Sequence, residues 1–322
     1  MMTAATTSRS LSPALTRRDR VRWTDLAWLV WRQHRLLIVV TTIGVAIASA
    51  LYWWDAADID ASGAYQVLAN LVVPAAAGLV GVSWGAPLLA GEYEQRTHLV
   101  AWAQDTSPVR WLTAKLVLLG AVIAVLWAIL GAADSTFIHA LSKNGPRFPD
   151  LFSPWGMAGF ESWIPLQVSY ALFGFALGVA VSGLVRRTVL SIGLTAVLFT
   201  GVRLAVLNWR PTFLPPLTAV LPPRGPTYGN DVGPGALQIG FGQTVDAAGR
   251  PTSVPFDCYD IRTDVWNIPC EKAHGAVATY QDYQPAGRLL PFHLIEFGIF
   301  GVLTAALIAF AVYRLRANRV AA

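Results

Sequence analysis

Six long apolar runs alternate with polar segments along this 322-residue chain. An α-helix needs about 20 apolar residues to cross the hydrocarbon core of a membrane, and each run is close to that length. The composition, 54% hydrophobic and 13% charged, agrees with that interpretation. The pattern predicts an all-α polytopic membrane protein whose six transmembrane helices are Leu36–Trp54, Val67–Ala90, Leu112–Ala133, Trp163–Val185, Thr188–Asn208 and Pro291–Tyr313.

The charges of the polar segments predict the orientation of these spans. Segments on the side of the two termini carry 15 of the 24 Lys and Arg residues, but only five of the 19 acidic residues. Lys and Arg are enriched in cytoplasmic loops. We therefore expect a multi-pass protein of the plasma membrane with both termini in the cytoplasm. The net charge of +5 reflects this bias and does not indicate nucleic-acid binding.

The N-terminal segment Arg17–Arg35 combines basic residues with Trp23, Trp28 and Trp31. This mixture is typical of the membrane–water boundary. It predicts an interfacial helix before the first span, so that residues 1–35 form a cytoplasmic tail and this helix. The alternative is a long, partly exposed beginning of the first span.

The next part of the chain, residues 36–208, holds the first five spans. The segment Asp134–Ser162 contains three prolines, and a re-entrant or interfacial piece within it is an open alternative. Arg186 and Arg187 alone separate the fourth and fifth spans, which predicts a tight hairpin at the cytoplasmic surface.

Residues 209–290 are rich in proline and glycine and are long enough for a small extracytoplasmic domain, with a possible strand at Ala236–Phe241. Cys258 and Cys270 both lie here, on the predicted oxidising side, which favours a disulfide over two free thiols. We interpret this domain as a lid over the external exit. The sixth span, 291–313, and a cytoplasmic tail, 314–322, complete the chain.

Two charged residues fall inside predicted spans, where a charge needs a partner. Arg203 lies about 24 Å along a helix from Arg187, and Glu296 lies about 7–8 Å from Pro291. These depths are similar, so we expect the two side chains to face each other or the transport pathway. They form either a gate or substrate contact, or a structural ion pair. An outward-snorkelling Arg203 is the remaining alternative.

The polar connection between the second and third spans, residues 91–111, is far more charged than a simple connection requires. Its alternating charges and its Leu99, Val100 and Trp102 favour docking to a soluble partner. A solvated loop is the simpler alternative.

Three stretches resemble ABC-2-type permeases of high-GC Gram-positive bacteria. The first is Gly85–Gly120, GAPLLAGEYEQRTHLVAWAQDTSPVRWLTAKLVLLG, although Arg96 stands where the family usually has glycine. The second is Trp28–Arg35, which ends in WRQHR, and the third is Tyr283–Arg316, which contains YQP, PF and IE. In the first stretch the pattern is matched by Glu92, Glu94, Thr97, His98, Leu99, Ala101, Trp102, Gln104, Arg110, Trp111, Leu112 and Lys115.

The resemblance implies a pair of permease subunits, driven by two separate cytoplasmic ABC ATPase subunits that bind ATP and Mg²⁺. We expect a homodimer, and a pair of two different permeases is the alternative. It also implies that the connection after the second span couples the permease to the ATPase. On this chain the implied coupling residues are Glu92, Glu94, Arg96, Thr97, His98, Trp102 and Arg110.

The chain contains no G-x-x-x-x-G-K-[ST], H-E-x-x-H or G-x-S-x-G motif. We therefore expect a transport subunit that is not an enzyme, with no cofactor or metal of its own, exporting an amphipathic drug, peptide or lipid. Two alternatives remain: a sensor or scaffold, and a membrane enzyme that uses the acidic residues of the external domain, Asp257, Asp260, Asp264 and Glu271, with His274.

Overall fold

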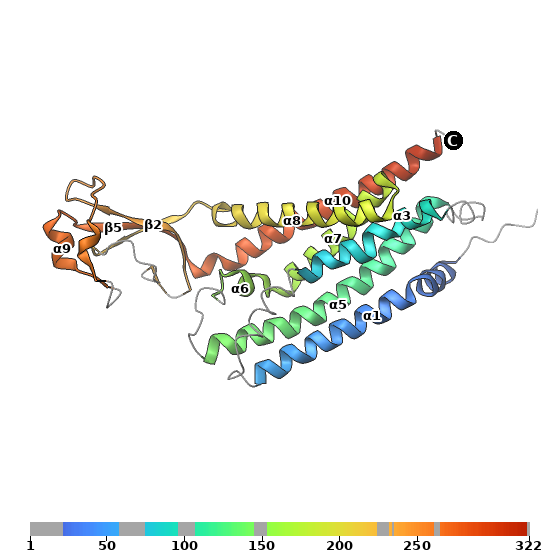
Figure 1. The fold of residues 1–322 in the computed structure, drawn as a ribbon, viewed down its shortest axis with the longest axis horizontal. Coiled ribbons are helices and arrows are strands. Elements are labelled where there is room, and N and C mark those ends of the chain that lie inside the picture. The colour runs from blue at the N-terminus through green and yellow to red at the C-terminus, as the bar shows by residue number, and fades with distance from the viewer. Residues whose placement is uncertain are drawn as a thin grey trace, which may run out of the picture.

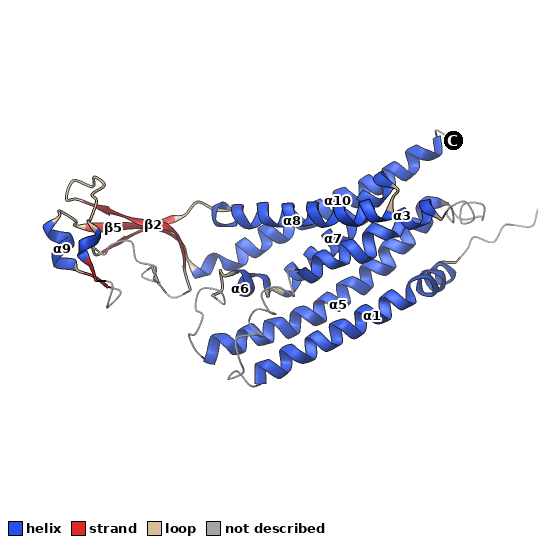
Figure 2. Cartoon of the chain, in the orientation of Figure 1, coloured by secondary structure: helices blue, strands red, loops and turns tan. Residues whose placement is uncertain are grey.

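The computed structural model describes residues 22–57, 75–95, 107–144, 153–223, 232–233, 235–260 and 265–320. Long helices run side by side in a bundle, and a small β-structure projects from one end of it (Figures 1 and 2). The start of the first helix and the C-terminus lie at the opposite end (Figure 1). We call these the sheet end and the termini end of the bundle.

Among the described residues, five helices are long and apolar enough to cross a membrane. The second apolar run is described only from residue 75, so the second of the six predicted spans remains a prediction. From residue 75 the chain is helical, forms a π-helical turn, η1 (Gly81–Gly85), and continues as α3 (Ala86–Glu94). The other bundle helices are α1 (Trp23–Ala57), α5 (Pro108–Asn144), α6 (Met157–Glu161), α7 (Ile164–Val185), α8 (Thr188–Trp209) and α10 (Leu289–Val320).

Helix α1 runs without interruption through the predicted boundary at residue 35. The structure therefore has no separate interfacial helix over residues 23–35, and it favours the alternative of a long, partly exposed start to the first span. The physical reason is that the sequence from Trp23 to Ile43 contains neither proline nor glycine, so nothing ends the helix. Trp23, Trp28 and Trp31 are each about half exposed along it.

Helix α5 likewise continues to Asn144, where a connection was expected from Asp134 onward. Residues 134–144 again lack proline and glycine, and Asp134 is buried. By contrast, α7 and α8 match the predicted fourth and fifth spans to within one residue. Arg186 takes a left-handed conformation with φ 56°, and this residue makes the tight turn between them.

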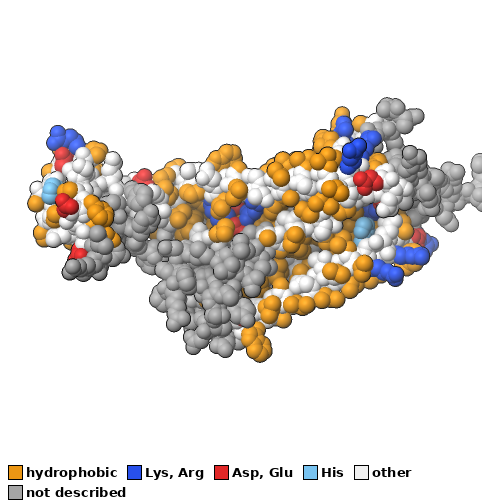
Figure 3. Space-filling view, in the orientation of Figure 1, with side chains coloured by type: hydrophobic (Ala, Val, Ile, Leu, Met, Phe, Trp, Pro, Cys, Tyr) orange, Lys and Arg blue, Asp and Glu red, His pale blue; other side chains and the backbone are white. Residues whose placement is uncertain are grey.

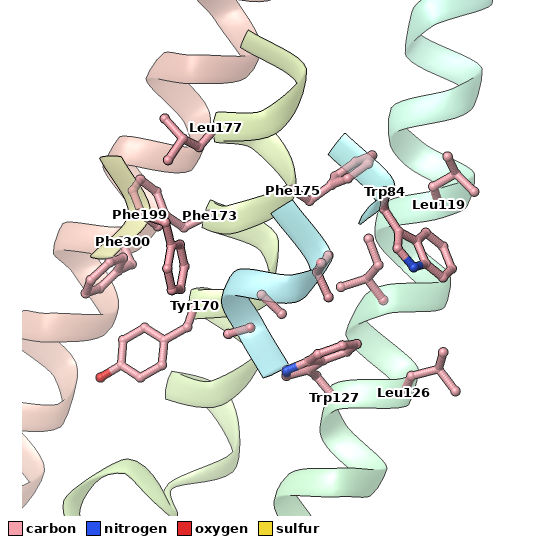
Figure 4. Packing of buried hydrophobic residues seen from close by; sticks show 14 of the residues in the cluster. Trp84, Leu119, Leu126, Trp127, Tyr170, Phe173, Phe175, Leu177, Phe199 and Phe300 are labelled. Atoms are coloured by element: carbon pink, nitrogen blue, oxygen red, sulfur yellow. The ribbon is translucent and has the colours of Figure 1, made fainter. Parts of the chain in front are cut away.

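Helix α7 is the centre of the bundle, and it packs against α5, α3, η1, α8 and α10. Aromatic side chains fill the space around it: Phe173 and Tyr170 each contact Phe300 of α10 edge to face, and Phe173 stacks on Phe199 of α8 (Figure 4). On its other side, Trp84 donates a hydrogen bond to Thr41 of α1 over 3.2 Å. This packing holds the helices in one body.

Two glycine pairs, Gly81 with Gly85 and Gly174 with Gly178, allow η1 and α7 to cross at backbone contact. A Cβ atom on Gly81 would lie 2.6 Å from the carbonyl oxygen of Gly174, and one on Gly178 would lie 2.6 Å from the amide nitrogen of Ala86. The two G-x-x-x-G spacings therefore face each other within the chain.

The segment between α8 and α10 contains a β-sheet, so the all-α description holds for the bundle alone. Strands β1 (Leu217–Leu221) and β2 (Leu237–Val245) flank the central β5 (Ala278–Gln284), both antiparallel to it. Beyond them lie a two-stranded ladder of β3 (Tyr259–Asp260) and β4 (Val265–Trp266) and the short α9 (Ile268–Ala273). Strand β2 overlaps the stretch in which a strand was expected.

Candidate functional site

Four buried charges and a tyrosine meet toward the sheet end of the bundle. We call Glu161, Tyr170, Arg203, Arg210 and Glu296 the charge cluster. Glu296 is fully buried and accepts hydrogen bonds from the Tyr170 hydroxyl over 2.5 Å and from Arg210 Nε over 2.8 Å. Arg203 bridges the two carboxylates, 2.6 Å from Glu161 and 3.3 Å from Glu296. A buried ion pair needs such additional hydrogen bonds to offset its lost hydration.

The cluster joins four helices and one 3-10 turn. Arg203 and Arg210 are seven residues apart on α8 and the 3-10 turn η2 (Arg210–Thr212) that follows it, a spacing that places them on one face. Glu161 ends α6, and Glu296 belongs to α10. The Arg203 guanidinium lies 3.6 Å from the centre of the Tyr170 ring of α7. The cluster therefore fastens α6, α7, α8 and α10 together.

The structure places Arg203 and Glu296, the two predicted intramembrane charges, in contact. Sequence reasoning missed Arg210 and Glu161, because it assigned both to external segments. The seven-residue spacing from Arg203 was a signal that could have found Arg210. No comparable signal existed for Glu161, since the helix α6 that carries it has only five residues.

Hydrophobic side chains cover the helices along their length on the face shown in Figure 3. Charged side chains gather at the termini end, and a small charged group lies among the hydrophobic ones nearer the sheet end. Exposed apolar residues on α1, α8 and α10 include Val40, Val189, Val197 and Val302. A surface of this kind suits contact with lipid.

A second site lies at the termini end, where the predicted coupling segment starts and finishes. Of its seven candidate residues, Glu92, Glu94 and Arg110 are described, whereas Arg96, Thr97, His98 and Trp102 lie outside the described residues. Lys115 of α5 is 1% exposed, forms an ion pair with Glu92, and lies 4.1 Å from the centre of the Trp111 ring.

Glu94 fastens the same end of α3 to α8. Its carboxylate accepts hydrogen bonds from the Thr188 hydroxyl over 2.7 Å and from the Thr188 backbone N–H over 3.0 Å. The hydrogen bond from the Thr188 hydroxyl, then that from the backbone N–H, holds the pKa of Glu94 below its usual value. At the far end of the segment, the Arg110 guanidinium lies 5.6 Å from the centre of the Trp23 ring of α1. The described residues at the two ends of the segment are thus held by helices of the bundle.

Breaking the Glu92–Lys115 pair is expected to destabilise the protein moderately. Glu92→Gln should lower the free energy of unfolding by about 2 kcal/mol, because Lys115 would stay buried without its ionic partner. The double variant Glu92→Gln/Lys115→Met should recover about 1 kcal/mol of that loss in thermal unfolding of the detergent-purified protein. Additive losses from the two substitutions would contradict this coupling.

Cys258 and Cys270 are joined by a disulfide, with their Cα atoms 5.5 Å apart. His274 lies beside it, its Nδ1 3.7 Å from Cys258 Sγ. The acidic residues that the enzyme alternative would use differ in solvent exposure. Asp257 and Asp260 are exposed, Glu271 is fully buried, and Asp264 lies outside the described residues. The described carboxylates therefore do not share one exposed face.

We call strands β1 to β5 and helix α9 the sheet domain. Replacing both cysteines by serine is expected to loosen this domain selectively. The disulfide closes a short loop, because its cysteines are separated by 12 positions in the sequence, so its loss should cost about 2 kcal/mol, at the low end of typical values. Limited proteolysis should then cut residues 217–284 faster while the helices stay protected. Equal cleavage rates with and without the disulfide would show that β-sheet packing alone holds the domain.

The long apolar helices define a polytopic membrane protein. Residues 27–210, more than half of the chain, match the model of the ABC-2 membrane transporter related family. The chain belongs to this family, and that membership indicates a transport permease of the membrane. The matched region includes the α3–α5 connection and Arg203, and it ends at Arg210. A comparison with curated proteins gives no match.

Proposed function

We propose that this chain is the membrane-spanning subunit of an ATP-driven exporter of the plasma membrane. Two copies form the pathway, each with six spans and cytoplasmic termini, and separate ABC ATPase subunits supply the energy. Family membership over the helical bundle is the observation that carries this proposal. The exported compound is amphipathic, in keeping with a pathway lined by apolar helices.

The anchors at the termini end support a route for the coupling movement. The Glu92–Lys115 and Glu94–Thr188 contacts tie the start of the coupling segment to α5 and to the first residue of α8. Helix α8 is 22 residues, or about 33 Å, long and carries Arg203 toward its other end. A displacement of the segment by the ATPase would therefore act on α8 and strain the charge cluster.

Transport then requires that the ATPase bind the two arrangements of the permease with different affinity. In the described arrangement the Arg203–Glu296 ion pair of the charge cluster links α8 to α10. An outward-open arrangement separates these helices and exchanges the cluster contacts for contacts with water or with the exported compound.

The test is a tagged purification in mild detergent from the native host. A stoichiometric soluble chain with a G-x-x-x-x-G-K-[ST] motif is expected to co-purify. Alanine at Arg96, Thr97, His98 and Trp102 should release it without changing the melting temperature of the permease. The matched control is Lys272→Ala, an exposed cation of the sheet domain, which should retain the ATPase.

Glu92 and Glu94 are poor choices for that docking test, because their side chains already bind Lys115 and Thr188. If no ATPase associates even after crosslinking, the exporter proposal fails. The sensor or scaffold alternative would then be favoured.

A further inference from the structure

Polar side chains continue from the charge cluster across the bundle toward α1. Asp134 of α5 accepts a hydrogen bond from the Gln167 amide of α7 over 2.7 Å, and both side chains are at least 97% buried. Asp134 also interacts electrostatically with Glu161 of the cluster and with Tyr52 of α1. We call the charge cluster together with Tyr52, Asp134 and Gln167 the polar layer.

The polar layer has one positive charge fewer than it has carboxyl groups. Its carboxyls belong to Asp134, Glu161 and Glu296, and its guanidiniums to Arg203 and Arg210. An uncompensated carboxylate in the interior of a membrane protein is costly. The layer therefore needs one further positive charge.

Within the described part of the chain, the two neighbouring titratable groups, Asp55 and His293, make no hydrogen bond to Asp134. Asp55 of α1 is a further carboxyl, and it interacts with Tyr52. The imidazole of His293 on α10 makes its Nε2 hydrogen bond to the backbone oxygen of Phe160 over 3.0 Å, and its ring stacks on Trp163. That ring nitrogen is thus directed at the backbone rather than at a carboxylate.

Unmatched acceptors show where the charge is missing. Among the described residues, Oε2 of Glu161, Oε1 of Gln167 and the hydroxyl of Tyr52 have no hydrogen-bond partner, although all three atoms are buried. The first two atoms can only accept. Inside a membrane, water does not compensate for such a deficit, which costs several kcal/mol per group in hydrocarbon. Of these three side chains, Gln167 is hydrogen-bonded to Asp134, the carboxyl without a guanidinium partner, and Glu161 and Tyr52 interact with Asp134 electrostatically.

We propose that the polar layer binds one monovalent cation, a proton or an alkali metal ion, between Asp134, Glu161 and Gln167. Carboxylate and amide oxygens provide the hard ligands that such a cation prefers. The site joins α5, α6 and α7, so a movement that separates Asp134 from Gln167 would release the cation. This binding is independent of the proposed ATPase partnership.

The test uses the full chain, purified in detergent without any partner. Melting temperatures are measured across pH, and at constant ionic strength with sodium, potassium or choline chloride. The infrared carbonyl band of a protonated carboxylic acid is recorded in parallel. A ligand that binds only the folded state raises the melting temperature with its concentration.

Each source of the charge has its own signature. A bound proton gives the wild type a protonated-carboxyl band and a melting temperature that falls as pH rises, because each pH unit lowers the proton concentration tenfold. A bound metal ion gives stabilisation by sodium or potassium that choline does not reproduce, and no such band.

Asp134→Asn removes the surplus charge and brings N–H donors to the site. This variant is expected to keep the wild-type melting temperature and to lose the band or the cation dependence. Asp257→Asn changes an exposed carboxyl of the sheet domain. This control should keep the wild-type melting temperature and whichever of the two signatures the wild type shows. The proposal is overturned if the wild type shows neither band nor metal-ion dependence, and that outcome is readable even if Asp134→Asn does not fold.

Discussion

Glu296→Gln is expected to cost about 3–5 kcal/mol of folding stability, because it breaks a buried ion-pair network on one side only. The Glu296 carboxylate is fully buried and receives donors from Tyr170, Arg203 and Arg210. A glutamine would present an amide group to these donors and leave two guanidiniums to share Glu161. Thermal unfolding in detergent, followed by size-exclusion profiles, measures the loss.

Two further variants define what that loss means. Glu94→Gln makes the same chemical change at an exposed carboxylate and should shift stability far less. Arg210→Gln combined with Glu296→Gln should be less harmful than the sum of the single changes. A Glu296→Gln protein that melts like the wild type yet fails to transport would identify this carboxylate as part of a gate rather than as a structural ion-pair partner.

The parts of the fold that the sequence predicts best are those whose ends carry local signals. Pro165 at the start of α7 and the Arg186–Arg187 pair between α7 and α8 interrupt the apolar pattern sharply, and those bounds agree with the structure. Proline suits the first turn of a helix, and paired arginines favour the aqueous side of a membrane. Both signals are read within a few residues.

Bounds were misjudged where hydrophobicity and helix formation diverge. Residues 134–144 are too polar for a predicted span, yet α5 continues through them. No residue there is a proline or glycine, and Asp134 accepts a hydrogen bond from Gln167 inside the bundle. The charged residues of α1 before residue 36 behave in the same way. Hydropathy reports where lipid contacts a helix, whereas proline, glycine and packing decide where it ends.

The candidate site also contains residues that local sequence signals can place and residues that only tertiary contacts place. Comparing helical depth placed Arg203 and Glu296 at similar levels, because both lie on regular helices of predicted direction, and the structure shows which of the alternatives holds: the two side chains are in contact. Glu161 and Arg210 joined them through the short helix α6 and the turn η2, whose positions depend on tertiary contacts such as the Arg210–Phe160 approach at 3.9 Å. A single sequence contains no depth estimate for such segments.

Placing a leucine at Gly178 is expected to prevent the crossing of α7 with η1 and to cost about 3 kcal/mol or more. The added Cβ would lie 2.6 Å from Ala86 N and 2.8 Å from Gly85 C, and these are backbone atoms that cannot rotate away. Gly201→Leu on α8 is the matched control, since a Cβ there meets nothing within 4 Å and points toward lipid-accessible space. Detergent-solubilised yield and melting temperature should fall for the first variant and stay near wild type for the second. If Gly178→Leu folds normally but no longer transports, the contact between Gly178 and the π-helical turn Gly81–Gly85 is needed for a movement of the transport cycle. The contact would then not be needed for the stability of the resting fold.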